Sequence, residues 1–145
     1  MPNKNLNRRL RAGIVGGGRG AFIGSLHRIA AELDGQALVV AGAMSADPVV
    51  ARASAAEWHL ERAYDSYAAM AAQESGLDDG IDFVIVATPN HLHYPVARAF
   101  LEAGISVVCD KPLAFDVQEG GALVELVSLS TALFALTLTY SGYQP

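Results

Sequence analysis

A lysine that directly follows an apolar, strand-like run is the clearest sign of chemistry in this sequence. Lys111 lies in the segment Cys109–Pro112, and the preceding run Ile105–Val108 is typical of a buried parallel strand. Ligands of α/β sheets bind at the carboxyl ends of the strands, which is where this lysine would lie. Its ammonium could hydrogen-bond a reacting hydroxyl or carbonyl and stabilise an oxygen that becomes more anionic. A surface lysine is the simpler alternative.

The two neighbours of Lys111 have expected roles of their own. Asp110 could orient the ammonium or pair with it, and Pro112 makes the segment rigid. Cys109 is expected in the core, because nothing nearby marks a reactive thiol.

A glycine-rich turn near the N-terminus is a second signal. Positions 16–21 read Gly-Gly-Gly-Arg-Gly-Ala, after a strand-like run and before a helical pattern. In a dinucleotide fold, Gly16 would make the tight turn, Gly18 would allow close approach of a pyrophosphate, and Ala21 would let the helix pack on the strand. Free N–H groups at the helix start would face the phosphates. The candidate cofactor loop comprises Gly16, Gly18, Arg19, Gly20 and Ala21; an ordinary glycine turn is the alternative.

The segment after the second strand lacks the acidic residue that usually binds the ribose hydroxyls of NAD. Ser45 stands about where that carboxylate is expected, and a serine does not repel the 2′-phosphate of NADP. Asp47 could take the acidic role, although helix capping suits it better. Arg19 or Arg52 could pair with a 2′-phosphate, with solvated surface arginine as the alternative for both. The choice between NAD and NADP therefore stays open.

A third candidate loop follows the strand-like run Ile81–Ala87. Pro89 ends the strand, and Asn90 is a candidate N-cap for the next helix. Because the loop lies at the carboxyl edge, it could contact a cofactor. The candidates are Thr88, Pro89, Asn90 and His93. For His93 and His91, a packing or helix-start role is the alternative.

These loops need a scaffold, and the rest of the sequence predicts one. Apolar strand-like runs alternate with amphipathic stretches, which predicts an α/β fold with a doubly wound, mainly parallel (Rossmann) sheet of about six strands and helices on both faces. Gly24, inside the first helix, suggests that this helix starts late. The expected strands are Leu10–Val15, Ala37–Met44, Ala63–Tyr64, Ile81–Ala87, Ile105–Cys109 and Leu133–Thr139. The expected helices are Phe22–Leu33, Asp47–Trp58, Ser66–Ser75, His91–Ala103 and Asp116–Leu129.

Composition excludes several other classes of protein. With 145 residues, 52% of them hydrophobic and 17% charged, the chain can form one domain with a core. The net charge of −5 argues against nucleic acid as a partner, and one cysteine excludes an internal disulfide. No spacing resembles a metal site. The twin arginine Arg8–Arg9 lacks a following signal segment, and polar residues interrupt the run Ala122–Tyr140, so we expect a cytoplasmic protein without a membrane span.

Three stretches together resemble the Gfo/Idh/MocA family, which includes glucose–fructose oxidoreductase and inositol dehydrogenases. They are Gly13–Gly18, Val86–His93 and Ala99–Leu113, and their order and spacing match across nearly the whole chain. The resemblance implies that residues 1–145 form an N-terminal Rossmann domain that binds NAD or NADP. It also implies that Lys111 reaches the substrate beside the nicotinamide.

In that family a second domain, built on a large sheet, supplies an Asp and a His to the site and commonly forms the oligomer interface. No such domain is present in this sequence, so we expect one domain of a longer, homo-oligomeric enzyme, or a truncated product that is inactive alone. The leading hypothesis is hydride transfer between a nicotinamide and a secondary alcohol of a sugar or cyclitol. A non-catalytic dinucleotide-binding or sensing module is the alternative. A methyltransferase-like domain would not explain Asp110–Pro112.

The sequence departs from the common family pattern in four places. Asp110 stands where a glutamate is usual, and Ser45 where an acidic residue is common. The segment Phe22–Leu26 lengthens the distance from the glycine loop to His27, which predicts a cofactor loop of different shape. Leu138 lies where polar residues often face the site.

Overall fold

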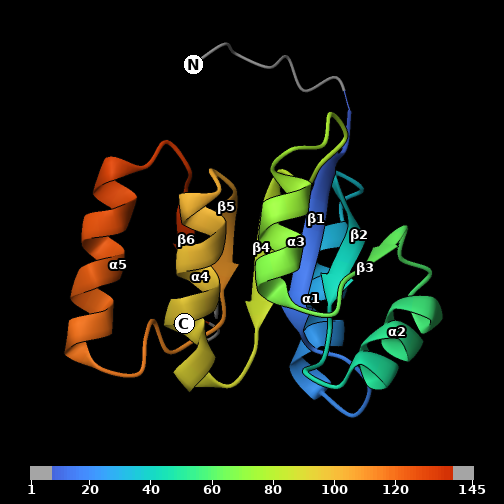
Figure 1. Cartoon of the computed structure of the whole chain (residues 1–145). Coiled ribbons are helices and arrows are strands. Elements are labelled where there is room, and N and C mark those ends of the chain that lie inside the picture. Colours follow the sequence, from blue (N-terminus) through green and yellow to red (C-terminus); the bar gives the residue numbers. More distant parts are fainter. Residues whose placement is uncertain (1–7, 139–145) are drawn as a thin grey trace, which may run out of the picture.

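Six parallel strands form one twisted sheet, shown in Figure 1, in a computed structural model that describes residues 8–138. The strand order is β3-β2-β1-β4-β5-β6, and every neighbouring pair is parallel. Strands β2 and β3 are added on one side of β1, and the chain then crosses to the other side of β1, where it adds β4, β5 and β6. Doubly wound sheets open a ligand crevice at this reversal of strand order, between β1 and β4. The strands are β1 (Leu10–Gly16), β2 (Ala37–Ala43), β3 (Arg62–Ala63), β4 (Phe83–Ala87), β5 (Ser106–Cys109) and β6 (Phe134–Leu136).

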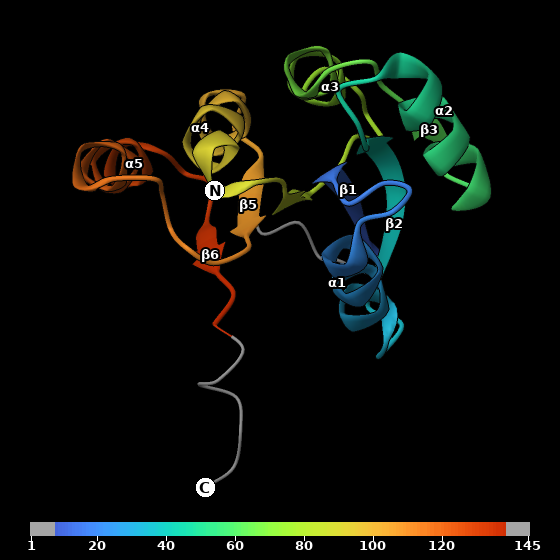
Figure 2. The same cartoon turned by 90° about the horizontal axis from the view of Figure 1, so that it is seen from below.

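Helices cover both faces of this sheet, as the alternation of patterns predicted. Helices α3, α4 and α5 lie on one face and α1 on the other (Figure 2). The helices are α1 (Phe22–Glu32), α2 (Pro48–Glu57), α3 (Tyr67–Glu74), α4 (His93–Glu102) and α5 (Val117–Leu129), with a 3-10 turn, η1 (Asn90–Leu92), before α4. The doubly wound Rossmann architecture is therefore confirmed.

Two apolar layers, one on each face, hold the sheet between the helices. The side chains of Val84 and Phe100 belong to the larger layer, and those of Ile14, Ile85 and Ala55 belong to the smaller one. Successive strand residues point to opposite faces, so both Val84 and Ile85 are buried. This two-sided burial explains why the central strands are apolar at nearly every position.

Several boundaries differ from the sequence expectations. Strand β3 begins one residue earlier than predicted, and β6 is shorter, while Thr139 lies outside the described residues. The expected late start of the first helix is wrong, because α1 begins at Phe22. Gly24 instead permits close packing: a Cβ on Gly24 would lie 2.5 Å from Gly17 Cα. Within residues 8–138, no helix has the length and apolar character to cross a membrane.

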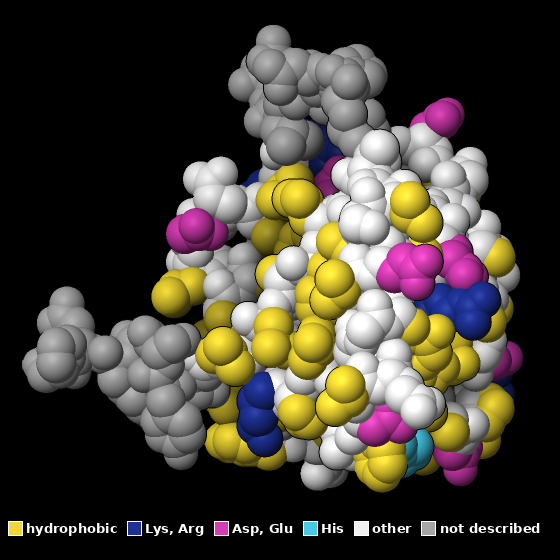
Figure 3. Space-filling view, turned by 90° about the vertical axis from the view of Figure 1, so that its left-hand side faces the viewer, with side chains coloured by type: hydrophobic (Ala, Val, Ile, Leu, Met, Phe, Trp, Pro, Cys, Tyr) yellow, Lys and Arg dark blue, Asp and Glu magenta, His cyan; other side chains and the backbone are white. Residues whose placement is uncertain are grey.

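Exposed apolar side chains gather on the side of the molecule where α5 lies (Figure 3). Val117, Val124 and Leu129 of α5 are 91%, 65% and 80% exposed. Phe115 and Leu133, just beyond the two ends of the helix, are exposed as well. Helix α5 thus presents apolar residues to solvent as well as to the core, which explains the apolar run at 122–140 without a membrane span.

A buried carboxylate fixes the crossover from β3 to β4. Glu74, at the end of α3, is 2% exposed. Its oxygens accept hydrogen bonds from Arg62 Nε (2.7 Å) and Nη2 (3.0 Å), from Tyr64 Oη (2.7 Å) and from the Ile81 amide (3.0 Å). Burial, with the Glu74 carboxylate adding to it, raises the pKa of Tyr64 to about 12. The Arg62 guanidinium therefore compensates the charge of Glu74, and donors from two segments satisfy its oxygens.

We expect Glu74→Ala to lower the free energy of unfolding by about 3 kcal/mol, because it leaves Arg62, Tyr64 and the Ile81 amide without their acceptor. The matched control is Glu102→Ala. Its carboxylate pairs with Arg98 at 2.8 Å on the surface of α4 and should contribute less than about 1 kcal/mol. Urea denaturation of both variants makes the comparison, and equal losses would contradict the structural role given to Glu74.

We expect Cys109 to be inert in the folded protein. Burial, with a smaller contribution from the nearby Asp110 carboxylate, raises the pKa of its thiol to about 12, and the side chain is fully buried. At pH 8 almost no thiolate forms, so an aromatic disulfide reagent should label Cys109 only as fast as the protein unfolds. Labelling within seconds in the absence of denaturant would contradict this.

Candidate functional site

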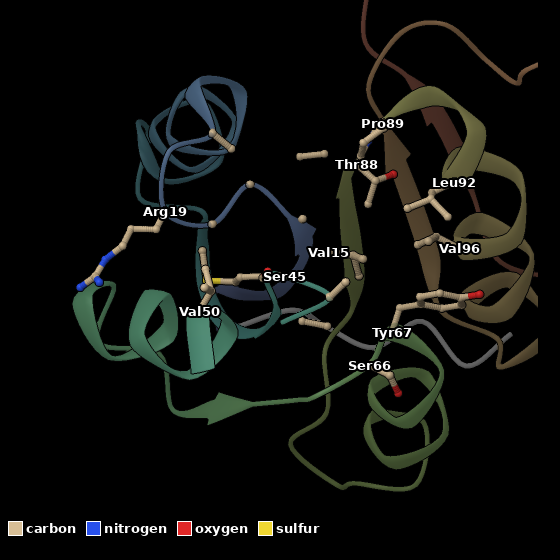
Figure 4. A pocket seen from close by; sticks show the side chains of 18 of the residues that line it. Val15, Arg19, Ser45, Val50, Ser66, Tyr67, Thr88, Pro89, Leu92 and Val96 are labelled. Atoms are coloured by element: carbon tan, nitrogen blue, oxygen red, sulfur yellow. The ribbon is translucent and has the colours of Figure 1, made fainter. Parts of the chain in front are cut away.

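A cavity of about 610 Å³ opens at the carboxyl edge of the sheet, beside the reversal between β1 and β4 (Figure 4). This volume is typical of sites for small molecules. Thr88, Pro89 and Leu92 lie on one side and Ser45 and Val50 on the other. Segments after β1, β2, β3 and β4 supply most of the lining: Gly16–Arg19 and Ala21, Met44–Ala46, Asp65–Tyr67, and Thr88–Pro89.

The glycine loop after β1 is shaped by close approaches of backbone. Gly16 and Gly17 have φ of +77° and +69°, which other residues rarely adopt. A Cβ on Gly18 would lie 2.6 Å from Met44 O, so β2 itself requires glycine there. The Gly18 amide donates to Met44 O (3.2 Å) and the Arg19 amide to Ser54 Oγ (2.9 Å). These two amides are therefore satisfied within the protein.

The start of α1 has no side-chain cap, in agreement with the free N–H groups expected at the helix start. The first N–H groups of a helix lack partners within the helix. Asp47, Ser66 and Asp116 supply side-chain caps to α2, α3 and α5, whereas the N-cap of α1 is Ala21, which makes none. Ala21 also lines the cavity. The start of α1 thus offers N–H donors and the positive end of its dipole to an anion in the cavity, which fits a pyrophosphate. The close-packing role predicted for Ala21 belongs to Gly24.

The wall that follows β2 carries no carboxylate. Ser45 lines the cavity, and its Oγ accepts a hydrogen bond from the Asp47 amide at 3.1 Å. Asp47 caps α2 through the amides of Val49 (2.8 Å) and Val50 (3.3 Å), so the capping role expected for it is confirmed. Its carboxylate is therefore occupied at the helix start and does not line the cavity.

Both candidate arginines are paired with carboxylates. Arg19 Nε donates to Glu57 Oε1 at 2.9 Å, and its side chain points away from the cavity in Figure 4. Hydrogen bonding to Glu57 raises the pKa of the Arg19 guanidinium. Arg52 pairs with Asp65 at 2.9 Å. Either arginine would have to leave its partner to bind a 2′-phosphate.

The loop after β4 carries a buried hydroxyl that has no partner in the part of the chain that the structure describes. Thr88 Oγ1 is buried and has no hydrogen-bond partner among the described residues. Buried hydroxyls are nearly always paired, so this unpaired one beside the cavity is unusual. The N-cap predicted at Asn90 is wrong: Asn90 is exposed, begins the 3-10 turn and makes no cap, and α4 starts three residues later.

The structure places His93 behind the cavity instead of in its wall. The ring is buried, with the residue 1% exposed. Nδ1 lies 2.6 Å from Pro112 O, and Nε2 lies 3.0 Å from Thr88 O. His93 therefore contacts two of the candidate loops, and its expected direct contact with a ligand has no support in this geometry.

Lys111 lies on the loop after β5, beside the loop after β4. The Asp110 amide donates to Val86 O (3.0 Å), which keeps the two loops adjacent. Lys111 is exposed, makes no hydrogen bond or ion pair with any residue in 8–138, and precedes a cis peptide bond to Pro112. The expected pairing of Asp110 with Lys111 is wrong. Asp110 Oδ1 accepts from Thr137 Oγ1 (3.1 Å) and lies 3.5 Å from His27 Nε2.

The cavity gathers part of the predicted set and adds residues that the sequence reasoning missed. Its lining includes the predicted Gly16, Gly18, Arg19, Ala21, Ser45, Thr88 and Pro89. Outside it lie Gly20, Asn90, His93, Asp110, Lys111 and Pro112. The missed residues include Gly17, Met44, Asp65, Ser66, Tyr67, Leu92 and Val96. Asp65–Tyr67 follows β3, so the rule that ligands bind at carboxyl ends would have indicated it had that two-residue strand been given weight.

Comparison with known proteins gives consistent matches over this domain. An uncharacterized oxidoreductase of Bacillus subtilis is 37% identical over 142 residues, which are 96% of this chain and 36% of that protein. The crystal structure of an oxidoreductase from Sinorhizobium meliloti has a TM-score of 0.88 at 46% identity, covering 94% of this chain and 38% of that one. An inositol dehydrogenase homolog from Azotobacter vinelandii, complexed with NADH and myo-inositol, has a TM-score of 0.89 at 39% identity, covering 94% and 36%.

The chain thus spans little more than a third of the length of these relatives. The model of the oxidoreductase family with an NAD-binding Rossmann fold matches residues 10–136. The match covers most of the chain, and the glycine loop, the uncapped start of α1 and the cavity at the strand reversal agree with it. The chain therefore belongs to the Gfo/Idh/MocA family of oxidoreductases.

Proposed function

We propose that residues 1–145 form the cofactor domain of a longer enzyme that transfers hydride between NAD(P) and a secondary alcohol of a sugar or cyclitol. The observation that carries the proposal is the cavity at the β1–β4 reversal, bordered by the glycine loop and the uncapped start of α1. The relative complexed with NADH and myo-inositol supports both the cofactor and the substrate class. A cytoplasmic, homo-oligomeric parent enzyme is part of the same proposal.

Each part of the cavity has a role in holding the cofactor. The N–H groups at the start of α1 would bind the pyrophosphate, and the Ser45 hydroxyl would bind a ribose hydroxyl. The wall after β2 has no carboxylate to repel a 2′-phosphate, so NADP is accepted alongside NAD. Thr88 would lie against the cofactor at the β4 side of the cavity.

Lys111 has the role of a hydrogen-bond donor to the substrate. The bound nicotinamide supplies the hydride acceptor or donor. The exposed Lys111 ammonium is free to bind the oxygen of the reacting alcohol or carbonyl and to stabilise its negative charge. Asp110 holds the start of the loop through Thr137 instead of neutralising the lysine. The principal acid/base group would come from the second domain of the parent enzyme.

A non-catalytic dinucleotide-binding module is the second candidate. It is favoured by the position of Lys111 outside the cavity. Both candidates require cofactor binding, whereas only the enzyme requires Lys111 for turnover.

We expect Ala21→Asp to weaken NADH binding at least about tenfold while stabilising the fold. An aspartate N-cap would satisfy the free amides of α1 and add about 1 kcal/mol of stability, but its charge would repel the pyrophosphate. Calorimetric titration of the 145-residue chain measures the affinity, and thermal melting measures the stability. Ala21→Asn, which caps without the charge, should lose less affinity. A stabilised Ala21→Asp variant with unchanged affinity would place the phosphates elsewhere.

We expect Lys111→Ala in the parent enzyme to lower kcat about 100-fold and to change the Kd for NADH little. The control is Arg98→Ala, which removes an exposed cation of α4 that pairs with Glu102. Steady-state kinetics and NADH titration give the two quantities. An unchanged kcat would exclude Lys111 from the mechanism and favour the non-catalytic module.

A further inference from the structure

The ring of His93 lies between the loop after β4 and the Lys111 loop. One ring nitrogen, Nδ1, is 2.6 Å from Pro112 O, and the other, Nε2, is 3.0 Å from Thr88 O. Thr88 lines the cavity, and Pro112 directly follows Lys111. The ring is 1% exposed and begins α4, so it has little freedom to move. It therefore acts as a spacer of fixed length between the two loops.

The Lys111 loop has few other anchors. The backbone N–H of Asp110 donates a hydrogen bond to Val86 O, and its side chain accepts one from Thr137. Further along the loop, the Phe115 amide donates to Glu119 at 3.0 Å. Between these two points, residues 111–114 make one hydrogen bond with the described part of the chain, and His93 makes it. Leu113 and Ala114 also pack against the larger apolar layer, so the ring is the polar anchor of the backbone next to Lys111.

The two contacts of His93 are chemically separable. A neutral imidazole donates through one nitrogen only, and both contacted atoms are carbonyl acceptors. The tautomer with its proton on Nδ1 binds Pro112, the one with its proton on Nε2 binds Thr88, and only the doubly protonated ring binds both. The shorter distance, at Nδ1, indicates that the bond to Pro112 holds the Lys111 loop.

We propose that His93 is a positioning residue, which sets the distance between the Lys111 ammonium and the cofactor held against Thr88. The inference rests on the function proposed above. The ring is buried behind both loops and does not line the cavity, so it acts through Lys111 and Thr88. Misplacement of a catalytic group by about 1 Å can lower a rate about 100-fold, so loss of the spacer should affect turnover more than binding.

Three substitutions separate the two contacts in the parent enzyme. In His93→Asn the amide nitrogen stands close to the place of Nδ1 and can still bind Pro112, whereas in His93→Gln it stands closer to Nε2 and Thr88. His93→Leu removes both bonds and keeps an apolar volume. We expect kcat to fall at least about tenfold in the Leu and Gln variants and less than about threefold in the Asn variant, with the Kd for NADH within about threefold of wild type in all three.

A second readout does not depend on turnover. In the 145-residue chain, the backbone ¹⁵N order parameters of Leu113 and Ala114 should fall in His93→Leu relative to wild type and stay near the wild-type values in His93→Asn. Thr131→Val, an exposed change remote from both loops, is the control for general loosening. Rescue by Asn but not by Gln, in both readouts, is the result expected.

The outcomes separate this inference from the proposed function. If Lys111→Ala lowers kcat but His93→Leu and His93→Gln retain it, the positioning role is wrong and the proposed function stands. Equal losses in the Asn and Leu variants would also overturn it, because the bond to Pro112 would then not matter. If Lys111→Ala itself leaves kcat unchanged, the proposed function is the part that fails. A Leu113 order parameter that is unchanged in His93→Leu would overturn the spacer even then.

Discussion

Parallel pairing of β1 with both β2 and β4 brings three strand ends to one edge, and the rest of the site depends on it. Gly13 to Val15 pair with β2 on one side and with β4 on the other, so the loops that follow must diverge at this point. The cavity is the space between them. A shift by one residue would exchange the side chains between the two apolar layers and disrupt the close packing of both, so this packing holds the register.

Close backbone contact at the glycine loop is the second requirement. Gly16 lies against the carbonyl of Ala87, Gly17 against Gly24, and Gly18 against the carbonyl of Met44. These contacts join β4, α1 and β2 to a single turn, so the turn is held by protein atoms before any ligand is bound. The free donors at the start of α1 are in this way held in place at the cavity, and binding would require little reordering of the chain.

Much of this arrangement could be predicted from the sequence, because strand burial and helix alternation are local patterns. The six strands, the Rossmann sheet and the glycine turn all followed from such patterns. Contacts between distant segments could not be derived in this way. The pairing of Asp110 with Thr137, the engagement of the Gly18 amide by Met44, and the packing of Gly24 on Gly17 each join residues whose proximity only the folded sheet creates. His93 was singled out by its loop, but its place between two carbonyls depends on the loop after β5.

The central claim is that a dinucleotide binds at the β1–β4 reversal with its phosphates at the start of α1. The most direct measurement is a titration of the ¹⁵N-labelled chain with NAD⁺, followed by amide chemical shifts in NMR spectra. The structure predicts the largest shifts at Gly17, Phe22, Ile23 and Thr88, and almost none along α5. Shifts that were absent, or concentrated on α5 and β6, would contradict it.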